Sequence, residues 1–207
     1  IIGIASKDKK LDRNLLIAGR DAMMHRGPDD GGVWWAEDGR VGLGHRRLAI
    51  IDLSKAGHQP MENNDGKFWI IYNGEVYNFK EIRHELQLLG WQFVSDSDTE
   101  VILKSYLQWK EGCLDKFNGM FSFTIFNSSK NTLFCARDRL GIKPFYYIHT
   151  DKTFYFASDI STLIASGLYE PEVNWEQLLP QIAFGGVLRP DTMYKNVYAL
   201  LPGHFLN

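Results

Sequence analysis

The segment M-F-S-F-T-I-F-N at residues 120–127, followed after a polar turn by T-L-F-C-A at 132–136, decides the fold class. In the first segment, aromatic and aliphatic residues alternate with serine and threonine, which is the period-two pattern of a half-buried strand. We expect the second segment to pair with the first in an antiparallel hairpin across residues 127–131. The chain therefore contains a sheet of neighbouring antiparallel strands.

Further short apolar segments and three amphipathic helices surround this hairpin. Apolar residues three or four positions apart predict the helices, which end by Gly27-Pro28, at Gly90 and near Gly112, because proline and glycine interrupt a helix. The other strands are expected at residues 1–6, 32–36, 41–45, 48–52, 67–72, 145–148 and 154–157, and a fourth helix at 175–182. Strands in neighbouring groups with helices among them indicate an α+β layered fold rather than a parallel βαβ series.

Composition and charge exclude several classes of function. The 207 residues include 23 Lys and Arg against 25 Asp and Glu, a formal net charge of −2. This balance argues against nucleic acid as the main partner, because a surface that follows phosphates needs a basic excess. No apolar run approaches the roughly 20 residues of a membrane span, and no signal-like leader is present, so no membrane partner is expected. Cys113 and Cys135 cannot form a disulfide framework, which predicts a reduced, cytoplasmic compartment.

The common cofactor motifs are absent. None of the six histidines stands in metal-ligand spacing with another. The sequence has no G-x-S-x-G nucleophile motif and no G-x-x-x-x-G-K-[ST] phosphate loop. We therefore expect neither a metal nor a nucleotide cofactor in this domain.

Polar clusters follow the apolar segments, where functional loops are usually carried. Each cluster alone has a structural interpretation: Asp98 suits a helix N-cap, Asn73-Gly74 suits a turn, and Arg47 suits a surface ion pair. The four clusters are HRGPDD at 25–30, HRRLAIID at 45–52, NGEVYN at 73–78 and SDTE at 97–100.

Taken together, the clusters resemble the glutaminase domain of glutamine-hydrolysing asparagine synthetases, which are class II amidotransferases of the N-terminal-nucleophile hydrolase type. The resemblance covers the whole chain, residues 1–207, as one glutamine amidotransferase domain. It implies a four-layer α/β/β/α sandwich of two antiparallel sheets flanked by helices. Its further motifs are GHRRLAIIDLS at 44–54, GHQPM at 57–61, NGEVYNF at 73–79, SDTEVIL at 97–103, GMFSF at 119–123, ARDRLGIKPFYY at 136–147, FASDI at 156–160 and LPGH at 201–204.

The resemblance implies a pocket that recognises both charged ends of free glutamine. Arg47 would bind the α-carboxylate, since a guanidinium matches a carboxylate with two parallel hydrogen bonds. Asp98, helped by Glu75, would hold the α-ammonium. Opposite charges at the two ends would exclude amides within a protein chain.

The resemblance also assigns groups to the side-chain amide of glutamine. The Asn73 side chain and the Gly74 backbone N–H would form an oxyanion hole. Glycine at 74 would let the backbone approach the substrate closely. The backbone around Ile50 and Ile51 would line the rest of the pocket.

The chain departs from the family where the nucleophile is expected. The family has a cysteine directly before the Gly-Ile of the first strand, and its own α-amine relays the proton. That position is Ile2 here, with Ile1 ahead of it, so we expect no glutamine hydrolysis. Neither Cys113 nor Cys135 falls at a motif position that would replace the thiol. Three explanations stand: a pseudo-amidase as in β-lactam synthetase, an altered start of a competent domain, or a structural domain of a ligase that uses free ammonia.

The family's ATP-binding Ser-Gly-Gly loop is also absent, which predicts that the ATP-dependent synthetase domain lies outside these 207 residues. ATP and Mg²⁺ are expected only in that domain. The first hypothesis is therefore a glutaminase domain that supplies ammonia for amidation of aspartate. The second is a catalytically inactive scaffold or glutamine-binding domain. Glutamine and the synthetase domain are the expected partners, and a homodimer is possible.

Two groups of polar residues outside these motif roles are also interpreted. His45, Arg46 and Tyr77 are equally consistent with supporting the fold and with touching the substrate. A salt-bridged corner is expected from Arg137, Asp138, Arg139 and Lys143, with a role at the interface to the synthetase domain as the alternative.

Overall fold

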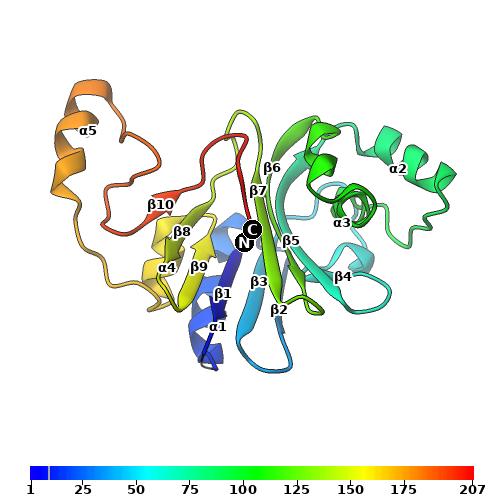
Figure 1. The fold of residues 1–207 in the computed structure, drawn as a ribbon, viewed down its shortest axis with the longest axis horizontal. Coiled ribbons are helices and arrows are strands. Elements are labelled where there is room, and N and C mark those ends of the chain that lie inside the picture. The colour runs from blue at the N-terminus through cyan, green and yellow to red at the C-terminus, as the bar shows by residue number, and fades with distance from the viewer. Residues whose placement is uncertain (9) are drawn as a thin grey trace.

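Two antiparallel sheets lie face to face between two layers of helices (Figure 1). The computed structural model describes residues 1–8 and 10–207. The first sheet has the strand order β10-β8-β9-β1-β3-β2 and the second the order β11-β7-β6-β5-β4. Every paired neighbour is antiparallel, so the predicted four-layer α+β sandwich is confirmed. The first sheet's strands are β1 (Ile2–Ser6), β2 (Asp30–Trp35), β3 (Val41–Arg47), β8 (Tyr146–His149), β9 (Thr153–Ala157) and β10 (Tyr198–Ala199); the second sheet's are β4 (Met61–Glu62), β5 (Phe68–Val76), β6 (Gly119–Asn127), β7 (Thr132–Arg137) and β11 (Phe205–Leu206).

The helices cover the two outer faces. α1 (Arg13–Ala22) and α4 (Ile160–Ala165) pack on the first sheet, and α2 (Phe79–Leu88) and α3 (Asp98–Trp109) pack on the second. Three apolar cores result, one under each helical layer and one between the sheets. The core between the sheets includes Phe145 and Phe156, whose rings stack with centroids 5.1 Å apart.

The hairpin of β6 and β7 forms as predicted, with Phe126 opposite Leu133 and Thr124 opposite Cys135. The sequence pattern predicted a half-buried strand, whereas both faces of β6 are covered. Ser122 and Thr124 are fully buried because the first sheet covers their face. Their hydroxyls bond to Pro144 O at 3.2 Å and to Cys135 Sγ at 3.4 Å, which allows polar residues inside the core.

Two of the local predictions are wrong. Residues 48–52 alternate like a strand but form a loop, in which Leu48 and Ile50 are exposed and Ala49 N–H bonds to the Asp29 carboxylate. Among the described strands none pairs with residues 48–52, and a strand needs a partner for its backbone groups. Asn73-Gly74 is not a turn but lies inside β5, opposite Ser122 and Phe121.

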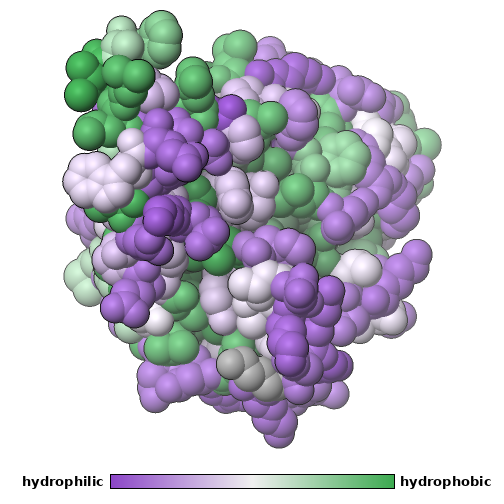
Figure 2. All heavy atoms as spheres, turned by 60° about the vertical axis from the view of Figure 1, so that its left-hand side comes forward, coloured by the Kyte–Doolittle hydropathy of each residue, from purple (hydrophilic) through white to green (hydrophobic). Residues whose placement is uncertain are grey.

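The helix predicted at 175–182 is observed as a 3₁₀ turn at Trp175–Gln177 followed by α5 (Leu178–Phe184). Figure 1 shows α5 projecting away from both sheets. None of its residues is buried, and the side chains of Leu179, Ile182 and Phe184 are about three-quarters exposed, at 74%, 73% and 76%. They form part of the green patch at the upper left of Figure 2. Among the described residues, no helix is both long and apolar enough to cross a membrane.

Because α5 packs on neither sheet, we predict that it is weakly protected when residues 1–207 are studied without a partner domain. A seven-residue helix with no buried side chain has little to hold it together in water. We expect its backbone amides to exchange with solvent at least about 100-fold faster than those of α3, which packs on a sheet. Hydrogen–deuterium exchange measures this difference, and protection of α5 equal to that of α3 would contradict it.

Candidate functional site

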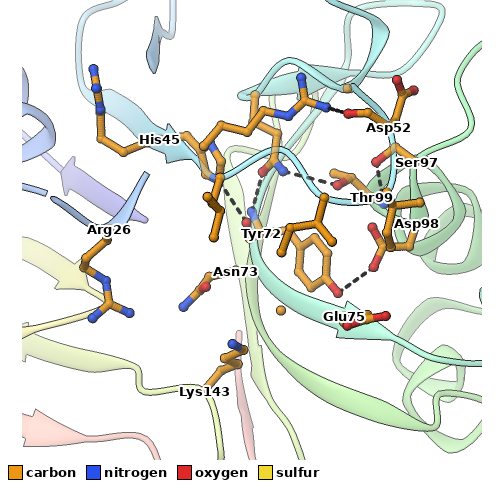
Figure 3. Close-up of a pocket in the computed structure, with 18 residues that line it drawn as sticks. Arg26, His45, Asp52, Tyr72, Asn73, Glu75, Ser97, Asp98, Thr99 and Lys143 are labelled. Atoms are coloured by element: carbon orange, nitrogen blue, oxygen red, sulfur yellow. Dashed lines mark hydrogen bonds between the residues drawn. The ribbon is translucent and has the colours of Figure 1, made fainter. Parts of the chain in front are cut away.

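A pocket of about 310 Å³ opens at one end of the sandwich, where three segments meet (Figure 3). The segments are the end of β3 with the loop after it, the second half of β5, and the first turn of α3. The pocket brings together seven of the eight residues predicted from the sequence: Arg47, Ile50, Ile51, Asn73, Gly74, Glu75 and Asp98. Their side chains come from loops and strands that are distant in the sequence. The roles assigned to them remain predictions.

Arg47 is held by backbone carbonyls rather than by acids. Its guanidinium donates to Ser54 O at 2.8 Å and to Asp52 O. Gly57 leaves room for it, because a Cβ at that position would lie 2.1 Å from an Arg47 nitrogen. Among the described residues, no carboxylate forms an ion pair with Arg47. Its charge is fixed in place but not neutralised.

Asp98 is a buried carboxylate that forms no ion pair with any described residue. Ser97, not Asp98, caps α3, since its hydroxyl accepts from Thr99 N–H. The Asp98 carboxylate instead accepts from Tyr72 O–H at 2.8 Å and from Val76 N–H at 3.1 Å. Burial raises the pKa of Asp98 above its usual 3.8, and the nearby charge of Glu75 adds to this effect. A carboxylate in this environment is stabilised by a ligand that brings a positive charge.

Asn73 and Gly74 offer donors to the same pocket. The Nδ2 of Asn73 is buried and has no partner among the described residues. Along β5, the N–H groups of Tyr72 and Val76 bond to Gln59 and Asp98 at the edge of the strand. Because N–H directions alternate along a strand, the N–H of Gly74 points from the same edge into the pocket.

Only glycine fits at position 74. A Cβ there would lie 2.1 Å from Met120 O and 2.7 Å from Phe121 Cα, both backbone atoms of the neighbouring strand β6. The backbone of Phe121 is itself bonded to Asp138. The Asp138 carboxylate accepts from Phe121 N–H, and the Asp138 N–H donates to Phe121 O. The close approach of β6 therefore fixes the position of the Gly74 peptide.

Two positioning residues were not predicted from the sequence. Asp52 links the loop to α3, because its carboxylate accepts from Ser54 N–H at 2.7 Å and from Asp96 N–H at 3.1 Å. Gln59 is buried and accepts from Tyr72 N–H at 2.7 Å while donating to Thr99 Oγ1 at 3.2 Å. Asp52 lies in the motif at 44–54 and Gln59 in the motif at 57–61. Each is a polar residue of a motif loop, and that feature could have identified it as a positioning residue.

Ile2 is the predicted site residue whose side chain is not brought to the pocket. It is fully buried on the other face of β1, between Gly44 of β3 and Gly19 of α1, where the absence of side chains makes room for it. Ile1 has the opposite orientation, because side chains alternate along a strand. It lies beside Asn73 in a cavity of about 40 Å³ with Met23, Arg26 and Arg46.

His45 supports the fold. It is buried, and its Nε2 bonds to Tyr72 O at 3.0 Å, which joins β3 of one sheet to β5 of the other. Burial, reinforced by nearby positive charges, lowers the pKa of His45 to about 3, so the ring is neutral at pH 7. Its Nδ1 is buried without a partner.

The predicted salt-bridged corner is wrong. The Arg137 guanidinium donates to the carbonyls of Lys143, Leu200 and Gly141. The Asp138 carboxylate accepts only backbone N–H groups, including those of Ile142 and Lys143 at 2.9 Å. Arg139 likewise bonds to carbonyls. These hydrogen bonds to backbone groups fix the conformation of the loop, and the side chain of Lys143 in this loop lines the pocket.

No further chemistry is visible in the part of the chain that the structure describes. It holds no cluster of three or more His, Cys, Asp or Glu residues suited to a metal ion. Cys113 and Cys135 are buried in the apolar cores, away from the pocket. Burial raises the pKa of each thiol to about 12, so neither is a nucleophile at pH 7.

The chain is similar to known proteins in sequence and in fold. The sequence model of the family described as "Glutamine amidotransferase domain" matches residues 1–207. Asparagine synthetase [glutamine-hydrolyzing] 3 of Bacillus subtilis is 40% identical over 90% of this chain, which spans only 30% of that protein. A putative asparagine synthetase of Methanocaldococcus jannaschii is 37% identical over 97% of this chain and 42% of that protein. The solved glutamine phosphoribosylpyrophosphate amidotransferase of B. subtilis shares the fold, with a TM-score of 0.69 and 20% identity over 84% of this chain and 45% of that chain.

Gln59 provides a test of how the pocket walls are joined. Gln59→Met keeps the length of the side chain but leaves the buried Tyr72 N–H without an acceptor. We expect the free energy of unfolding to fall by about 1–3 kcal/mol. Denaturant unfolding measures this change, with the exposed Gln87→Met in α2 as the matched control. Equal stability of the two variants would contradict the role given to Gln59.

Proposed function

Because this chain belongs to the family of glutamine amidotransferase domains and is homologous to asparagine synthetases, we propose that residues 1–207 form a domain that binds free glutamine. The observation that carries the proposal is the pair of unneutralised charges in one pocket. Among the described residues, Arg47 has no acidic partner and Asp98 has no cationic one. A free amino acid supplies both missing charges at once.

The proposed orientation follows from the chemistry of each wall. The α-carboxylate would bind the Arg47 guanidinium, and the α-ammonium would bind Asp98 with Glu75 nearby. The side chain would then extend toward Asn73. Its amide oxygen would accept hydrogen bonds from Asn73 Nδ2 and Gly74 N–H, and Ile50 and Ile51 would border the pocket. Two donors aimed at one oxygen are also the arrangement that stabilises a tetrahedral oxyanion.

We further propose that this chain does not hydrolyse glutamine. Isoleucine occupies positions 1 and 2, and the two cysteines are buried far from the pocket with raised pKa values. The hydroxyls of Ser97 and Thr99, which line the pocket, are engaged as acceptors of hydrogen bonds. The retained charged groups support a domain that is competent apart from its nucleophile. The alternative is a catalytically inactive scaffold of a ligase that resembles β-lactam synthetase or uses free ammonia, and the burial of Ile2 in the core favours it.

The partner would be a synthetase domain on the same polypeptide. The part that matches this chain makes up only 30%, 28% and 42% of three of the relatives. In the proposed complete protein, that domain would hold ATP and Mg²⁺ and use the ammonia to amidate aspartate in the cytoplasm. The exposed apolar side chains of α5 offer it a docking surface, so α5 should gain protection from hydrogen exchange when the domain is present.

Glutamine binding tests the pocket directly. We expect calorimetry to detect binding of L-glutamine to this chain and a loss of about 10- to 100-fold in affinity for Arg47→Met and for Asp98→Asn, since each removes one charge-assisted contact. Arg40→Met, at an exposed hairpin, serves as the control and should bind normally. If both pocket variants bind L-glutamine as tightly as the unchanged chain, the proposed orientation is wrong.

The same measurement carries a pH dependence. Glutamine binding needs the ionised form of Asp98, whose pKa lies above 3.8 in the empty pocket. The affinity for glutamine should therefore be constant near neutral pH and fall as the pH is lowered. The fall should begin at a higher pH than it would for an aspartate of ordinary pKa. Binding in that range should release protons, which calorimetry in buffers of different ionisation enthalpy measures. Proton uptake would contradict the assignment.

Restoring a thiol tests the nucleophile. We expect Ile2→Cys, in a chain that begins at that cysteine, to release glutamate from glutamine, because removal of Ile1 empties the cavity beside Asn73. Ile1→Cys is the matched comparison, since residue 1 already faces Asn73. Adding Asn73→Ala to the active variant should slow the reaction about 10²- to 10³-fold. Glutamine binding without glutamate release in either variant would refute the nucleophile assignment.

A further inference from the structure

Another cavity, of about 160 Å³, opens at the end of the sandwich opposite the proposed glutamine pocket. We call it the far-end cavity; residues of β1, β3, β6, β7 and the β8–β9 hairpin line it. Strand β3 begins at Val41 in this cavity and ends at Arg47 in the pocket, so the two sites lie about 20 Å apart at roughly 3.3 Å per strand residue. Among the described residues, none lines both sites.

The floor of the far-end cavity is the open end of the apolar core between the sheets. All five of its apolar lining residues belong to that core or pack on it. In the first sheet, Ala5 of β1 pairs with Val41 of β3 on one side and with Phe154 of β9 on the other. In the second sheet, Phe126 of β6 pairs with Leu133 of β7. A side chain of one methyl group at position 5 therefore leaves a space between the two sheets.

The size and the walls of this cavity suit one aromatic ring. An apolar cavity of roughly 150 Å³ in another protein binds benzene, and the volume here is nearly the same. Two of the apolar wall residues, Phe126 and Phe154, are aromatic. The ring of His149 lies edge-on to Phe154, with centroids 6.4 Å apart, and also lines the cavity. Aromatic rings favour offset and edge-on contacts of this kind.

The polar rim of the far-end cavity contains two lysines and, among the described residues, no carboxylate. The two lysines differ in their partners. Lys152 forms an ion pair with Asp8, with Nζ and Oδ2 3.0 Å apart. Lys7 forms no ion pair within the described part of the chain. Its ammonium is therefore available to an anion.

The remaining charged groups around the rim occur in opposite pairs. The Arg40 guanidinium donates to Lys7 O, but Arg40 is itself paired with Asp38 at 2.8 Å. Asp151 precedes one lining residue in the sequence and Lys130 precedes another, and neither of them lines the cavity. Counting these groups and the pair of Lys152 with Asp8, the charge left over at the rim is that of Lys7.

We propose that the far-end cavity binds a small aromatic carboxylate, with its ring between the two sheets and its carboxylate at Lys7. The ring would cover apolar surface of Ala5, Phe126 and Phe154 that now faces water. The carboxylate would form a charge-assisted hydrogen bond with the Lys7 ammonium. The proposal does not depend on glutamine binding, because the two sites have no described residue in common.

Phenylacetate is a suitable probe, and a titration of the ¹⁵N-labelled 207-residue chain followed by NMR shows where it binds. We expect the amide signals of Ala5, Val41 and Leu133 to shift with a Kd of about 1 mM, given a ligand of about ten non-hydrogen atoms. The signals of Asn73 and Gly74 should stay in place. Phenylacetamide, which has the same shape without the charge, should bind about 2- to 5-fold more weakly, and acetate, which lacks the ring, should cause no shifts.

Two variants test the ring site and the charge separately. Ala5→Leu adds three carbon atoms to the cavity and should weaken phenylacetate binding at least about tenfold, whereas Ala183→Leu on the exposed α5 should not. Lys7→Met should lower the affinity for phenylacetate to that for phenylacetamide, and Lys80→Met in α2 should leave it unchanged. Because Lys7 is exposed, its variant tests the proposal even if Ala5→Leu does not fold.

The outcomes are distinct. If phenylacetate shifts no amide signal at this end of the sandwich, or shifts those of Asn73 and Gly74 instead, the far-end cavity is not its site and the proposal is wrong. Equal affinities for phenylacetate and phenylacetamide, or an unchanged affinity in Lys7→Met, would overturn the carboxylate as the ligand class. Loss or retention of glutamine binding has no bearing on this result.

Discussion

Tyr72 hydrogen-bonds to all three walls of the pocket. Its carbonyl accepts from His45 of the first sheet, its N–H donates to Gln59 of the loop, and its hydroxyl donates to Asp98 of α3. These bonds are buried, where an unpaired polar group costs about 1–3 kcal/mol. The relative positions of β3, β5 and α3 are therefore fixed by one residue, and so is the separation between the charges that would bind the two ends of an amino acid.

The molecule treats its buried charges in two ways. Arg137 and Asp138 are surrounded by backbone groups, and Glu100 pairs with Lys104 while it accepts from the backbone and side chain of Ser95. Such fully bonded charges hold loops in place at little cost in stability. In the part of the chain that the structure describes, Arg47, Asp98 and Lys143 form no ion pair, although hydrogen bonds hold the side chains of the first two in place. A charge that is buried without an opposite charge lowers the stability of the fold. A ligand that supplies the opposite charge offsets this loss when it binds.

Rigidity and exposure are unevenly distributed around this site. The pocket is built on strands and on the capped start of α3, whereas α5 stands apart with its apolar residues in solvent. A surface of that kind is stabilised by contact with another protein domain. The proposed ligand site thus lies on the sandwich, whereas the proposed docking surface lies on α5.

The sequence by itself determined the layered α+β fold, the hairpin of β6 and β7, and the motif residues that line the pocket, since strand alternation, turn chemistry and motif order are local properties. Tertiary structure alone decided which face of each strand is covered and by what. It buried Ile2 against α1, made a loop of residues 48–52 for lack of a partner strand, and kept Asn73-Gly74 within β5. It also brought Lys143 and Arg26 beside Asn73, from segments more than 40 residues away on either side of it. Residues so distant along the chain come together only when the two sheets pack face to face. Local sequence patterns do not predict this packing.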